Sequence, residues 1–439
     1  MVSLRRLSGV LEYLVDDSVG VIRGVVEVPR QAGTPDFFHF AATAGNTQAF
    51  CPMPNFASGG GASTVRDVAV AKAVGEAVER YCAALYEMDD LPLTSRRAAA
   101  FECAAPAEFA LYSPEQYAQP DFPWQAFDDD TPVRWARAFD PKFDAECRVP
   151  AAMIFLPYMY YTATGDTPIV QPISTGLACH CSPAEAVVAA ICEVIERDAF
   201  TLTWQCRLGA PQLLIETLSD ANYEMVRRFE RTAASVVLLD ITTDVDVPTV
   251  LAVLRNESPA APALVVAAAA DLDPEQAVRK SLEELAHTAR YSQQIATGLP
   301  RLTPDPGYSN VVDQVSHLNF WVDRRHIHLA DFLVASPVRM PFGELASRTS
   351  GNAQRDLAFL LDQVEQTGHR VLLADLTTPD IREVGLTVIR AVIPGFHPLF
   401  MGHRLRALGG RRLRETPQKL GYPGITGANG DNPAPHPYP

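Results

Sequence analysis

Apolar residues recur at helical spacing in three alanine-rich stretches, near residues 65–82, 183–200 and 274–291. Each stretch follows a run of small residues, and in each an alanine stands seven positions before a glutamate. These pairs are Ala69 and Glu76, Ala186 and Glu193, and Ala277 and Glu284. We read the three stretches as copies of one structural unit, with the third copy the weakest because His287 replaces its second glutamate.

Shorter apolar runs rich in β-branched residues lie between these helices and predict strands. The predicted strands are 21–28, 37–42, 135–139, 152–161, 235–240, 248–254, 263–269, 370–375 and 386–392. A further amphipathic helix is predicted over 353–367. The pattern favours the α+β class, with the repeated helices packed on sheets.

The change of residue composition along the chain predicts three regions. Residues 1–57 form a β-rich segment, residues 58–420 carry the repeats, and residues 421–439 form a Gly- and Pro-rich tail. Proline stands at 433, 435, 437 and 439, and this alternation predicts an extended, polyproline-like end.

Charge and cysteine content narrow the class of protein. A net charge of -15 over 439 residues argues against non-specific nucleic-acid binding. No apolar run is long enough to span a membrane, and eight cysteines are too few for a disulfide framework in so long a chain. We therefore expect a cytoplasmic protein with reduced thiols.

The first two repeat helices each carry the pattern Glu-x-x-Glu-Arg. Three-residue spacing places Glu76 and Glu79 on one helix face, and Glu193 and Glu196 on another. Four converging carboxylates need a cation, and all-oxygen ligands suit Mg²⁺ bridging to phosphates. The sequence hypothesis is two magnesium ions that hold a nucleoside triphosphate. Its phosphate oxygens would meet three cationic side chains, Lys72, Arg80 and Arg197.

Two simpler interpretations stand beside this hypothesis. Each glutamate helix is also compatible with a solvated face carrying internal ion pairs such as Glu76 with Arg80. The sequence Cys179-His180-Cys181 invites a zinc interpretation, but its spacing is unusual for zinc, and local packing is the simpler explanation. The Gly59–Gly61 loop lacks the P-loop pattern, and no dinucleotide-binding fingerprint is present.

Taken together, these stretches resemble the YcaO family, in particular its azoline-forming cyclodehydratases. The resemblance rests on GEAVERY at 75–81, on STGLACHCSPAEAVVAAICEVIERDA at 174–199 and on the helix DPEQAVRKSLEELAHTAR. It also rests on DLTTPDIREVGLTVIRAVIPGFHPL at 375–399 and on the terminal Pro-x-Pro-x-Pro.

The resemblance implies a YcaO fold over residues 58–420 and ATP-dependent conversion of Cys, Ser or Thr residues of a ribosomal precursor peptide to thiazolines or oxazolines. It implies ATP and Mg²⁺ as cofactors, with the metal held by Glu76, Glu79, Glu193 and Glu196. The nucleotide-contacting set expected from it is Ser58, Lys72, Arg80, Ser174, Arg197, Glu284 and Arg290. The tail residues expected at the catalytic centre are Pro435, Pro437 and Pro439.

Two departures from the family pattern bear on these contacts. The family often has a lysine between the loop glycines, where this chain has Gly59-Gly60-Gly61, and Lys72 is the candidate substitute. Thr175 stands where asparagine is common. Because the repeats begin near residue 58, we also expect a separate E1-like (ThiF-like) partner that delivers the peptide. The resemblance further implies a homodimer, and a flavin dehydrogenase is a further candidate partner.

Two alternative functions remain at this stage. YcaO relatives also make thioamides or amidines with the same ATP chemistry, and the proline terminus argues for azoline formation instead. A non-catalytic scaffold that docks the precursor peptide is disfavoured because all four metal-site glutamates are present.

Overall fold

The computed structural model describes residues 4–31, 33–426 and 430–439. Its helices are α1 Leu4–Leu14, α2 Arg66–Ala83, α3 Pro114–Tyr117, α4 Pro183–Gln205, α5 Asp220–Glu230, α6 Pro274–Gly298, α7 Gln314–Phe320, α8 Ala353–Gln366, α9 Pro379–Glu383 and α10 Arg412–Lys419. The longer strands are β1 Ile22–Glu27, β2 Phe38–Ala44, β3 Ser58–Ser63, β5 Val133–Ala136, β9 Leu177–His180, β11 Ala234–Asp240, β12 Thr249–Asn256, β13 Leu264–Ala270, β15 Leu372–Asp375 and β16 Thr387–Val392. The shorter ones are β4 Leu93–Thr94, β6 Phe139–Asp140, β7 Ala145–Glu146, β8 Val149–Pro150, β10 Gln212–Leu214 and β14 Arg339–Pro341.

The strands form four sheets. One has the order β1-β2-β3, a second β13-β12-β11-β10-β14, a third β7-β6-β15-β16-β9 and a small fourth β4-β5-β8. The α+β prediction is confirmed. None of the described helices is long and apolar enough to cross a membrane.

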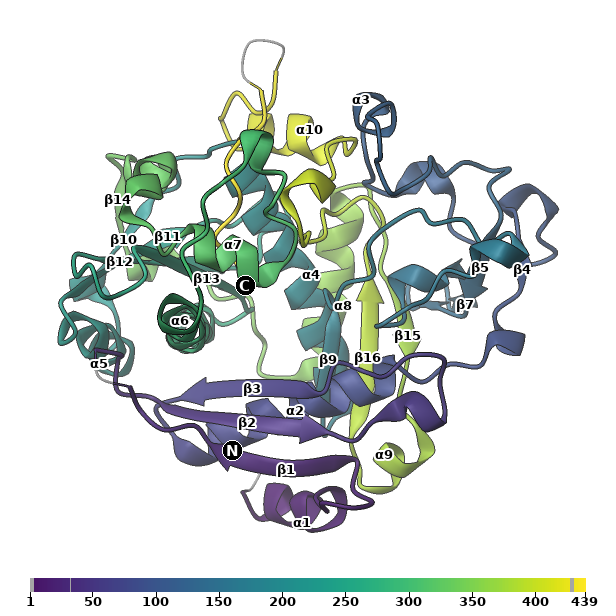
Figure 1. Cartoon of the computed structure of the whole chain (residues 1–439), viewed down its shortest axis with the longest axis horizontal. Coiled ribbons are helices and arrows are strands. Elements are labelled where there is room, and N and C mark those ends of the chain that lie inside the picture. Colours follow the sequence, from purple (N-terminus) through teal and green to yellow (C-terminus); the bar gives the residue numbers. More distant parts are fainter. Residues whose placement is uncertain (1–3, 32, 427–429) are drawn as a thin grey trace.

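The three repeat helices each pack on a sheet of their own, as predicted. Helix α2 lies on β2 and β3, α4 on β9 and β16, and α6 on β12 and β13 (Figure 1). Proline at the first helical position starts α4 and α6, and the Asp273 side chain caps α6 by accepting from the Glu275 amide.

Each repeat helix also contacts the strand that precedes the helix of another unit. Helix α2 contacts β9, α4 contacts β13, and α6 contacts β3. The three units therefore close into a ring, and faces of all three helices meet near its centre. The sheet β1-β2-β3 also joins residues before and after position 57, while the division into three regions stays a prediction.

The glycine run 59–61 was expected to be a loop, and this is wrong: it lies within strand β3. The reason is close packing, because a Cβ on Gly59 would lie 2.5 Å from the Ala73 carbonyl oxygen of α2, and one on Gly61 would lie 2.3 Å from that of Ala69. Small residues on both partners allow the helix backbone to approach the strand.

Two other local expectations fail. Residues 152–161, predicted as a strand, contain a 3₁₀ turn and irregular chain that packs through apolar side chains such as Ile154 and Tyr158. Helix α1 was not expected in the N-terminal segment, where the sequence indicated short strands.

The C-terminal tail contains no helix or strand in its described residues and runs inward, so that the C-terminus lies among α4, α6 and α7 (Figure 1). Residues 434–438 are buried. The indole nitrogens of Trp204 and Trp321 donate to the carbonyls of Ala434 and Pro435 at 3.1 and 3.0 Å. Residues 427–429 of the predicted tail lie outside the described part of the chain.

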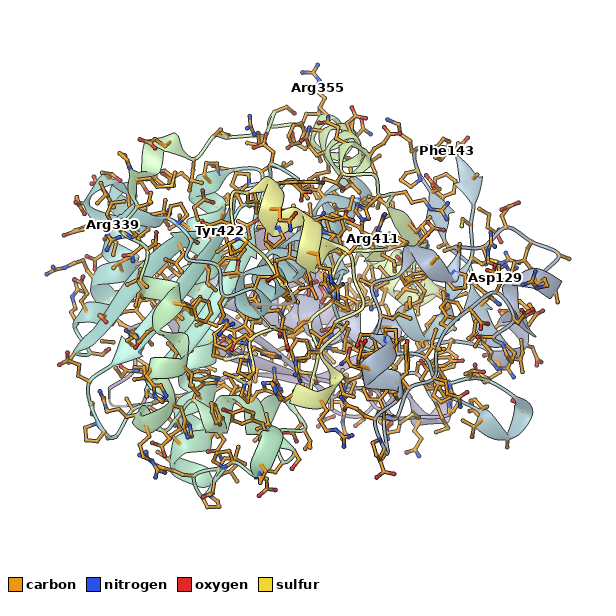
Figure 2. All side chains as sticks on the ribbon, turned by 90° about the horizontal axis from the view of Figure 1, so that it is seen from above. Asp129, Phe143, Arg339, Arg355, Arg411 and Tyr422 are labelled. Atoms are coloured by element: carbon orange, nitrogen blue, oxygen red, sulfur yellow. The ribbon has the colours of Figure 1, made fainter. Side chains whose placement is uncertain are left out.

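Helix α10 leads into the tail and is tied to α4 by a buried ion-pair network. Arg412 contacts Asp198 of α4 at 2.7 Å and Asp244 at 2.8 Å. Its neighbour Arg411 instead lies on the surface (Figure 2).

Candidate active site

The first glutamate of each Glu-x-x-Glu pair is held by the chain segment just before its own helix. Glu76 accepts a hydrogen bond from the Gly60 amide at 2.7 Å, and Glu193 accepts one from the Gly176 amide at 3.2 Å. Gly176 has a φ of 87°, and a Cβ there would lie 2.2 Å from the Ala391 carbonyl oxygen. The two units therefore fix their first carboxylates in the same way.

The second glutamates are held from outside their own units. Glu79 accepts from the Cys179 amide of β9 at 2.7 Å. Glu196 accepts from the Tyr438 hydroxyl of the tail at 2.6 Å.

In each of the first two units, an arginine pairs with the glutamate carboxylates. Arg80 lies 3.0 Å from Glu76, and Arg197 lies 3.4 Å from Glu193 and 3.2 Å from Glu196. These ion pairs match the simpler interpretation of each helix taken alone. Taken together, the charges of the two helices interact, which a pair of separate solvated faces would not show.

The interaction is visible in the pKa values of the carboxyls. Burial, with the nearby charges of Glu193 and Glu76 adding to it, raises the pKa of Glu79 to about 8 despite Arg80. Burial, reinforced by Glu193 and Glu284, raises the pKa of Glu196 to about 7. Burial also raises the pKa of Glu193, against Arg197, Arg80 and Arg390. At these three carboxyls, burial outweighs the neighbouring arginines and disfavours the charged form.

The third unit adds a lysine-bridged pair. Lys72 of α2 lies 2.9 Å from Glu283 and 3.2 Å from Glu284 of α6. The Ser63 hydroxyl donates to Glu283 at 2.7 Å. Although burial opposes it, the Lys72 ammonium lowers the pKa of Glu284. The His287 ring lies directly against Gly60, where a Cβ would come within 2.1 Å of it.

This donor set fits Mg²⁺ together with an anionic ligand. No three of the four glutamates lie within ligand distance of one another, but Mg²⁺ commonly takes one or two protein carboxylates and completes its shell with phosphates and water. The Nη1 atoms of Arg80 and Arg390 are buried and make no hydrogen bond within the described chain. Such unpartnered cationic donors suit phosphate oxygens.

The structure therefore brings together Glu76, Glu79, Glu193, Glu196, Arg80, Arg197, Lys72 and Glu284. Three predicted nucleotide contacts behave differently. Ser58 is exposed at the start of β3, and Ser174 is half-buried in the loop before β9. Arg290 turns to the segment after β1, where its Nη2 donates to the Pro29 carbonyl at 2.9 Å.

Sequence reasoning missed four residues that lie at or beside the cluster: Glu283, His287, Arg390 and Tyr438. A signal existed for two of them. His287 was noted at the second-glutamate position of the third unit, and Tyr438 lies between two of the predicted tail prolines.

The Cys-His-Cys segment divides between two environments. Cys179 presents its amide to Glu79, whereas His180 and Cys181 lie with Glu185 at the start of α4. Among the described residues, these three are the one group of three candidate ligands whose atoms all lie within 4.8 Å of one another.

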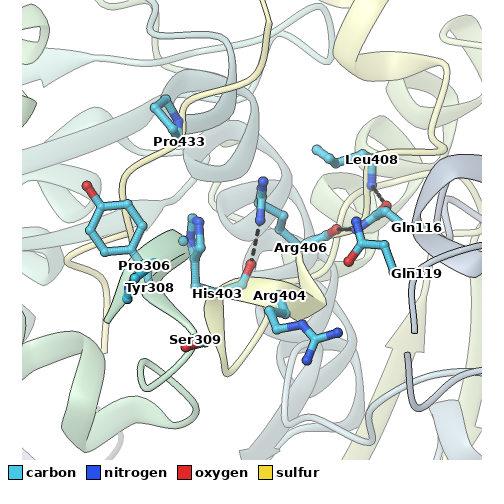
Figure 3. A pocket seen from close by; sticks show the side chains of 11 residues that line it. Gln116, Gln119, Pro306, Tyr308, Ser309, His403, Arg404, Arg406, Leu408 and Pro433 are labelled. Carbon is cyan, nitrogen blue, oxygen red and sulfur yellow. Dashed lines mark hydrogen bonds between the residues drawn. The ribbon is translucent and has the colours of Figure 1, made fainter. Parts of the chain in front are cut away.

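A surface pocket of about 390 Å³ lies where the tail enters the molecule (Figure 3). Pro433 forms one wall, and Tyr308, His403 and Arg406 form others. Arg406 donates to the His403 carbonyl and pairs with Asp431 at 2.6 Å. The pocket thus marks the start of the tail's path and contains none of the clustered carboxylates.

Comparison with known proteins places these features in context. The family model described as YcaO cyclodehydratase, ATP- and Mg²⁺-binding, matches residues 59–397. An uncharacterised protein of Methanothermobacter thermautotrophicus is 27% identical over 357 residues, covering 79% of this chain and 85% of the relative. The prediction of ATP and Mg²⁺ as cofactors is confirmed by the family description.

Solved structures share the fold. A heterocyclase in complex with substrate and cofactor superposes with a TM-score of 0.79 at 20% identity, covering 98% of this chain and 57% of that one. The heterocyclase TruD gives 0.66 at 20% identity, covering 85% and 51%. YcaO from Methanopyrus kandleri bound with AMPPCP and Mg²⁺ gives 0.65 at 18% identity, covering 92% of both chains. The chain therefore spans a little over half the length of the first two.

Proposed function

The chain belongs to the YcaO family, and from this premise we propose that it is an ATP-dependent cyclodehydratase that forms azolines in a peptide. The observation that carries the proposal is the meeting of the tail with the glutamate cluster, where the Tyr438 hydroxyl lies 2.6 Å from Glu196. A proline-rich end at the carboxylates supports azoline formation over the thioamide and amidine alternatives, in which such a terminus is not characteristic.

The proposed reaction begins with a Cys, Ser or Thr side chain of the peptide attacking the preceding backbone carbonyl. The resulting oxyanion takes the γ-phosphoryl group of ATP, giving ADP. The attack itself closes the five-membered ring and releases the proton of the side-chain thiol or hydroxyl. Loss of inorganic phosphate and of the amide proton then forms the C=N bond of the azoline. The peptide loses the elements of one water for each ring, and its former amide oxygen leaves in the phosphate.

In this proposal, Glu76, Glu79, Glu193 and Glu196 hold Mg²⁺, which screens the phosphate charges and polarises the phosphoryl group. Arg80 and Arg197 bind phosphate oxygens and stabilise the charge that develops during transfer. Lys72 fixes Glu284 beside them through its 3.2 Å contact. Pro435, Pro437 and Pro439 hold the tail in an extended path to the reaction centre. Ser58, Ser174 and Arg290 stay proposed nucleotide contacts.

We extend the proposal to the setting of the reaction by family resemblance. The substrate is a ribosomal precursor peptide, delivered by a separate E1-like partner, and the enzyme is a homodimer. A flavin dehydrogenase that oxidises azolines is a further candidate partner. All eight cysteines are free, which agrees with the cytoplasmic location we propose.

The test is mass spectrometry of a Cys-, Ser- and Thr-containing precursor after incubation with this protein, its partner, ATP and Mg²⁺. We expect loss of one water per modified residue, with equimolar phosphate release. A heavy oxygen isotope in the reacting carbonyl should appear in that phosphate. A version ending before Pro433 should lose this activity.

Other outcomes select the alternatives. Water loss that survives the truncation would detach the tail from the chemistry and favour the amidine reaction. A peptide that binds without mass change or ATP turnover would favour the non-catalytic scaffold.

A further inference from the structure

The repeat architecture gives a standard against which each glutamate can be compared. In the first unit, the side chain of Glu79 on α2 accepts a hydrogen bond from the Cys179 amide of β9, the strand of the second unit. By the same pattern, Glu196 of the second unit should be held by β13, the strand of the third, because α4 packs on it as α2 packs on β9.

Strand β13 does not hold Glu196 directly. Within the described chain, the hydrogen bond that Glu196 receives comes from the Tyr438 hydroxyl. That hydroxyl lies 3.3 Å from the Ala268 amide of β13. Ala268 precedes Glu284 by 16 residues, as Gly60 precedes Glu76. The tyrosine hydroxyl therefore bridges the Glu196 carboxylate of the second unit and the Ala268 amide of the third unit. Between the first and second units, the Glu79 carboxylate bonds directly to the Cys179 amide.

The surroundings of Tyr438 fix its ring as well as its hydroxyl. The Arg197 guanidinium lies over the ring, 4.7 Å from its centroid, and the Phe200 ring packs at 4.3 Å. The side chain is 2% exposed. A hydroxyl held this way, donating to an acidic oxygen in a buried site, orients that carboxylate strongly.

The tail delivers Tyr438 through anchored backbone. The Asn432 amide donates to the Gln205 carbonyl at 2.9 Å, and His317 Nδ1 lies 2.9 Å from the His436 carbonyl. His436 in turn accepts from the Tyr438 amide at 3.2 Å, while its Nε2 lies 2.8 Å from the Phe400 carbonyl. Prolines on both sides of Tyr438 limit the conformations that the free tail loses on docking.

We infer that Tyr438 is a positioning residue of the metal–nucleotide site, which orients Glu196 and links docking of the C-terminal tail to binding of Mg²⁺ and nucleotide. This inference rests on the proposed role of Glu196 as a metal ligand. Because coupling between two binding events is reciprocal, bound metal and nucleotide must also stabilise the docked tail.

The test is calorimetric titration of the full-length protein with AMPPCP, in Mg²⁺ and in EDTA. Tyr438→Phe keeps the ring and its packing and removes the hydroxyl. We expect it to weaken the Mg²⁺-dependent affinity by about tenfold to a hundredfold, as loss of a ligand-orienting hydrogen bond does. Affinity in EDTA should not change.

The matched control is Tyr422→Phe. The Tyr422 hydroxyl donates to the Gly209 carbonyl at 3.2 Å near the base of the tail and touches no clustered carboxylate. It should bind AMPPCP as wild type does. Hydrogen exchange at residues 430–439 should slow on addition of AMPPCP and Mg²⁺ in wild type, and slow less in Tyr438→Phe.

A double-mutant cycle separates positioning from a general structural effect. If Tyr438 acts through Glu196, then Glu196→Gln with Tyr438→Phe binds no more weakly than Glu196→Gln alone. Additive losses, or equal Mg²⁺-dependent affinities in wild type and Tyr438→Phe, would overturn the inference and leave the proposed function intact. Absence of any Mg²⁺-dependent binding by wild type would overturn both.

Discussion

Without a metal, Glu79 and Glu196 carry a proton for much of the time near neutral pH, because their pKa values are about 8 and about 7. Burial, together with the charge of the neighbouring Glu193, favours their protonated forms, and a metal ligand must lose that proton. Magnesium and protons therefore compete for the same oxygens.

The first prediction follows from this competition. The Mg²⁺-dependent affinity for AMPPCP should rise between about pH 6 and about pH 8, with protons released on binding at the lower pH. Calorimetry in two buffers of different ionisation enthalpy measures that release. An affinity that is flat across this range, with no protons released, would show that these carboxyls are not the ligands.

The same shifts set the sign of the pH dependence of stability without metal. The folded protein holds these protons where the unfolded chain, with ordinary carboxyl pKa values, has released them. Their contribution to the free energy of unfolding is therefore fully present below the unfolded pKa and declines as pH rises toward about 8. Mg²⁺ with nucleotide should remove much of this decline, which thermal unfolding can follow.

At the scale of elements, the contact between β3 and α2 depends on residues without side chains. Gly59→Ala would place a Cβ 2.5 Å from a helix carbonyl, and the backbone must move to accept it. We expect a loss of about 1–3 kcal/mol in the free energy of unfolding, measured by urea denaturation. Gly24→Ala in β1 meets no atom within 4 Å and should cost much less. Equal effects of the two would contradict the close-packing account.

The junction between α10 and α4 makes a separate prediction. Asp198 is fully buried and bonded by Arg412, so Arg412→Met strands a carboxylate in the interior. We expect a loss of about 3–5 kcal/mol, partly restored when Asp198→Asn is added. The control Arg411→Met removes a surface arginine and should change stability little. No rescue by the second substitution would show that the charge is not the cause.

The elements predicted best from sequence are those with a strong period and a clear boundary. Strands such as β11, β12 and β16 appear within two residues of their predicted ranges, because their patterns reflect one buried face or full burial. The three repeat helices begin within one residue of their predicted starts, but α4 and α6 run five and seven residues beyond their predicted ends. Helix α2, for example, buries Ala69, Ala73 and Ala77 along one side. The glycine run failed because glycine favours loops locally, whereas here tertiary packing requires it in a strand.

At the scale of the whole molecule, the candidate site is a product of the ring closure of three units. Sequence indicated the four glutamates and their arginines, since spacing within a helix fixes the shared face. Nothing local in the chain indicated that α6 would send Glu283 to Ser63 across 220 residues, or that the penultimate residue would reach Glu196. Such contacts depend on how the units pack.

The cofactors and the position of the tail were expected from the resemblance to the YcaO family, because periodicity carries no information on them. The family model that matches residues 59–397 confirms the resemblance. It led to the expectation that the tail would lie at the catalytic centre, while the tyrosine that meets Glu196 became evident only from the folded chain. For Arg290, the nucleotide contact implied by the family stays a proposal, and its hydrogen bond to the Pro29 carbonyl became evident only from the folded chain.

The most direct test of the proposed metal–nucleotide site is a crystal structure of the full chain grown with AMPPCP and Mn²⁺, in which anomalous scattering locates the metal ions. We expect metal peaks coordinated by Glu76, Glu79, Glu193 and Glu196 and by the nucleotide phosphates, with Tyr438 still bonded to Glu196. Peaks confined to the other described ligand group, His180, Cys181 and Glu185, or a nucleotide bound away from the two glutamate helices, would contradict it.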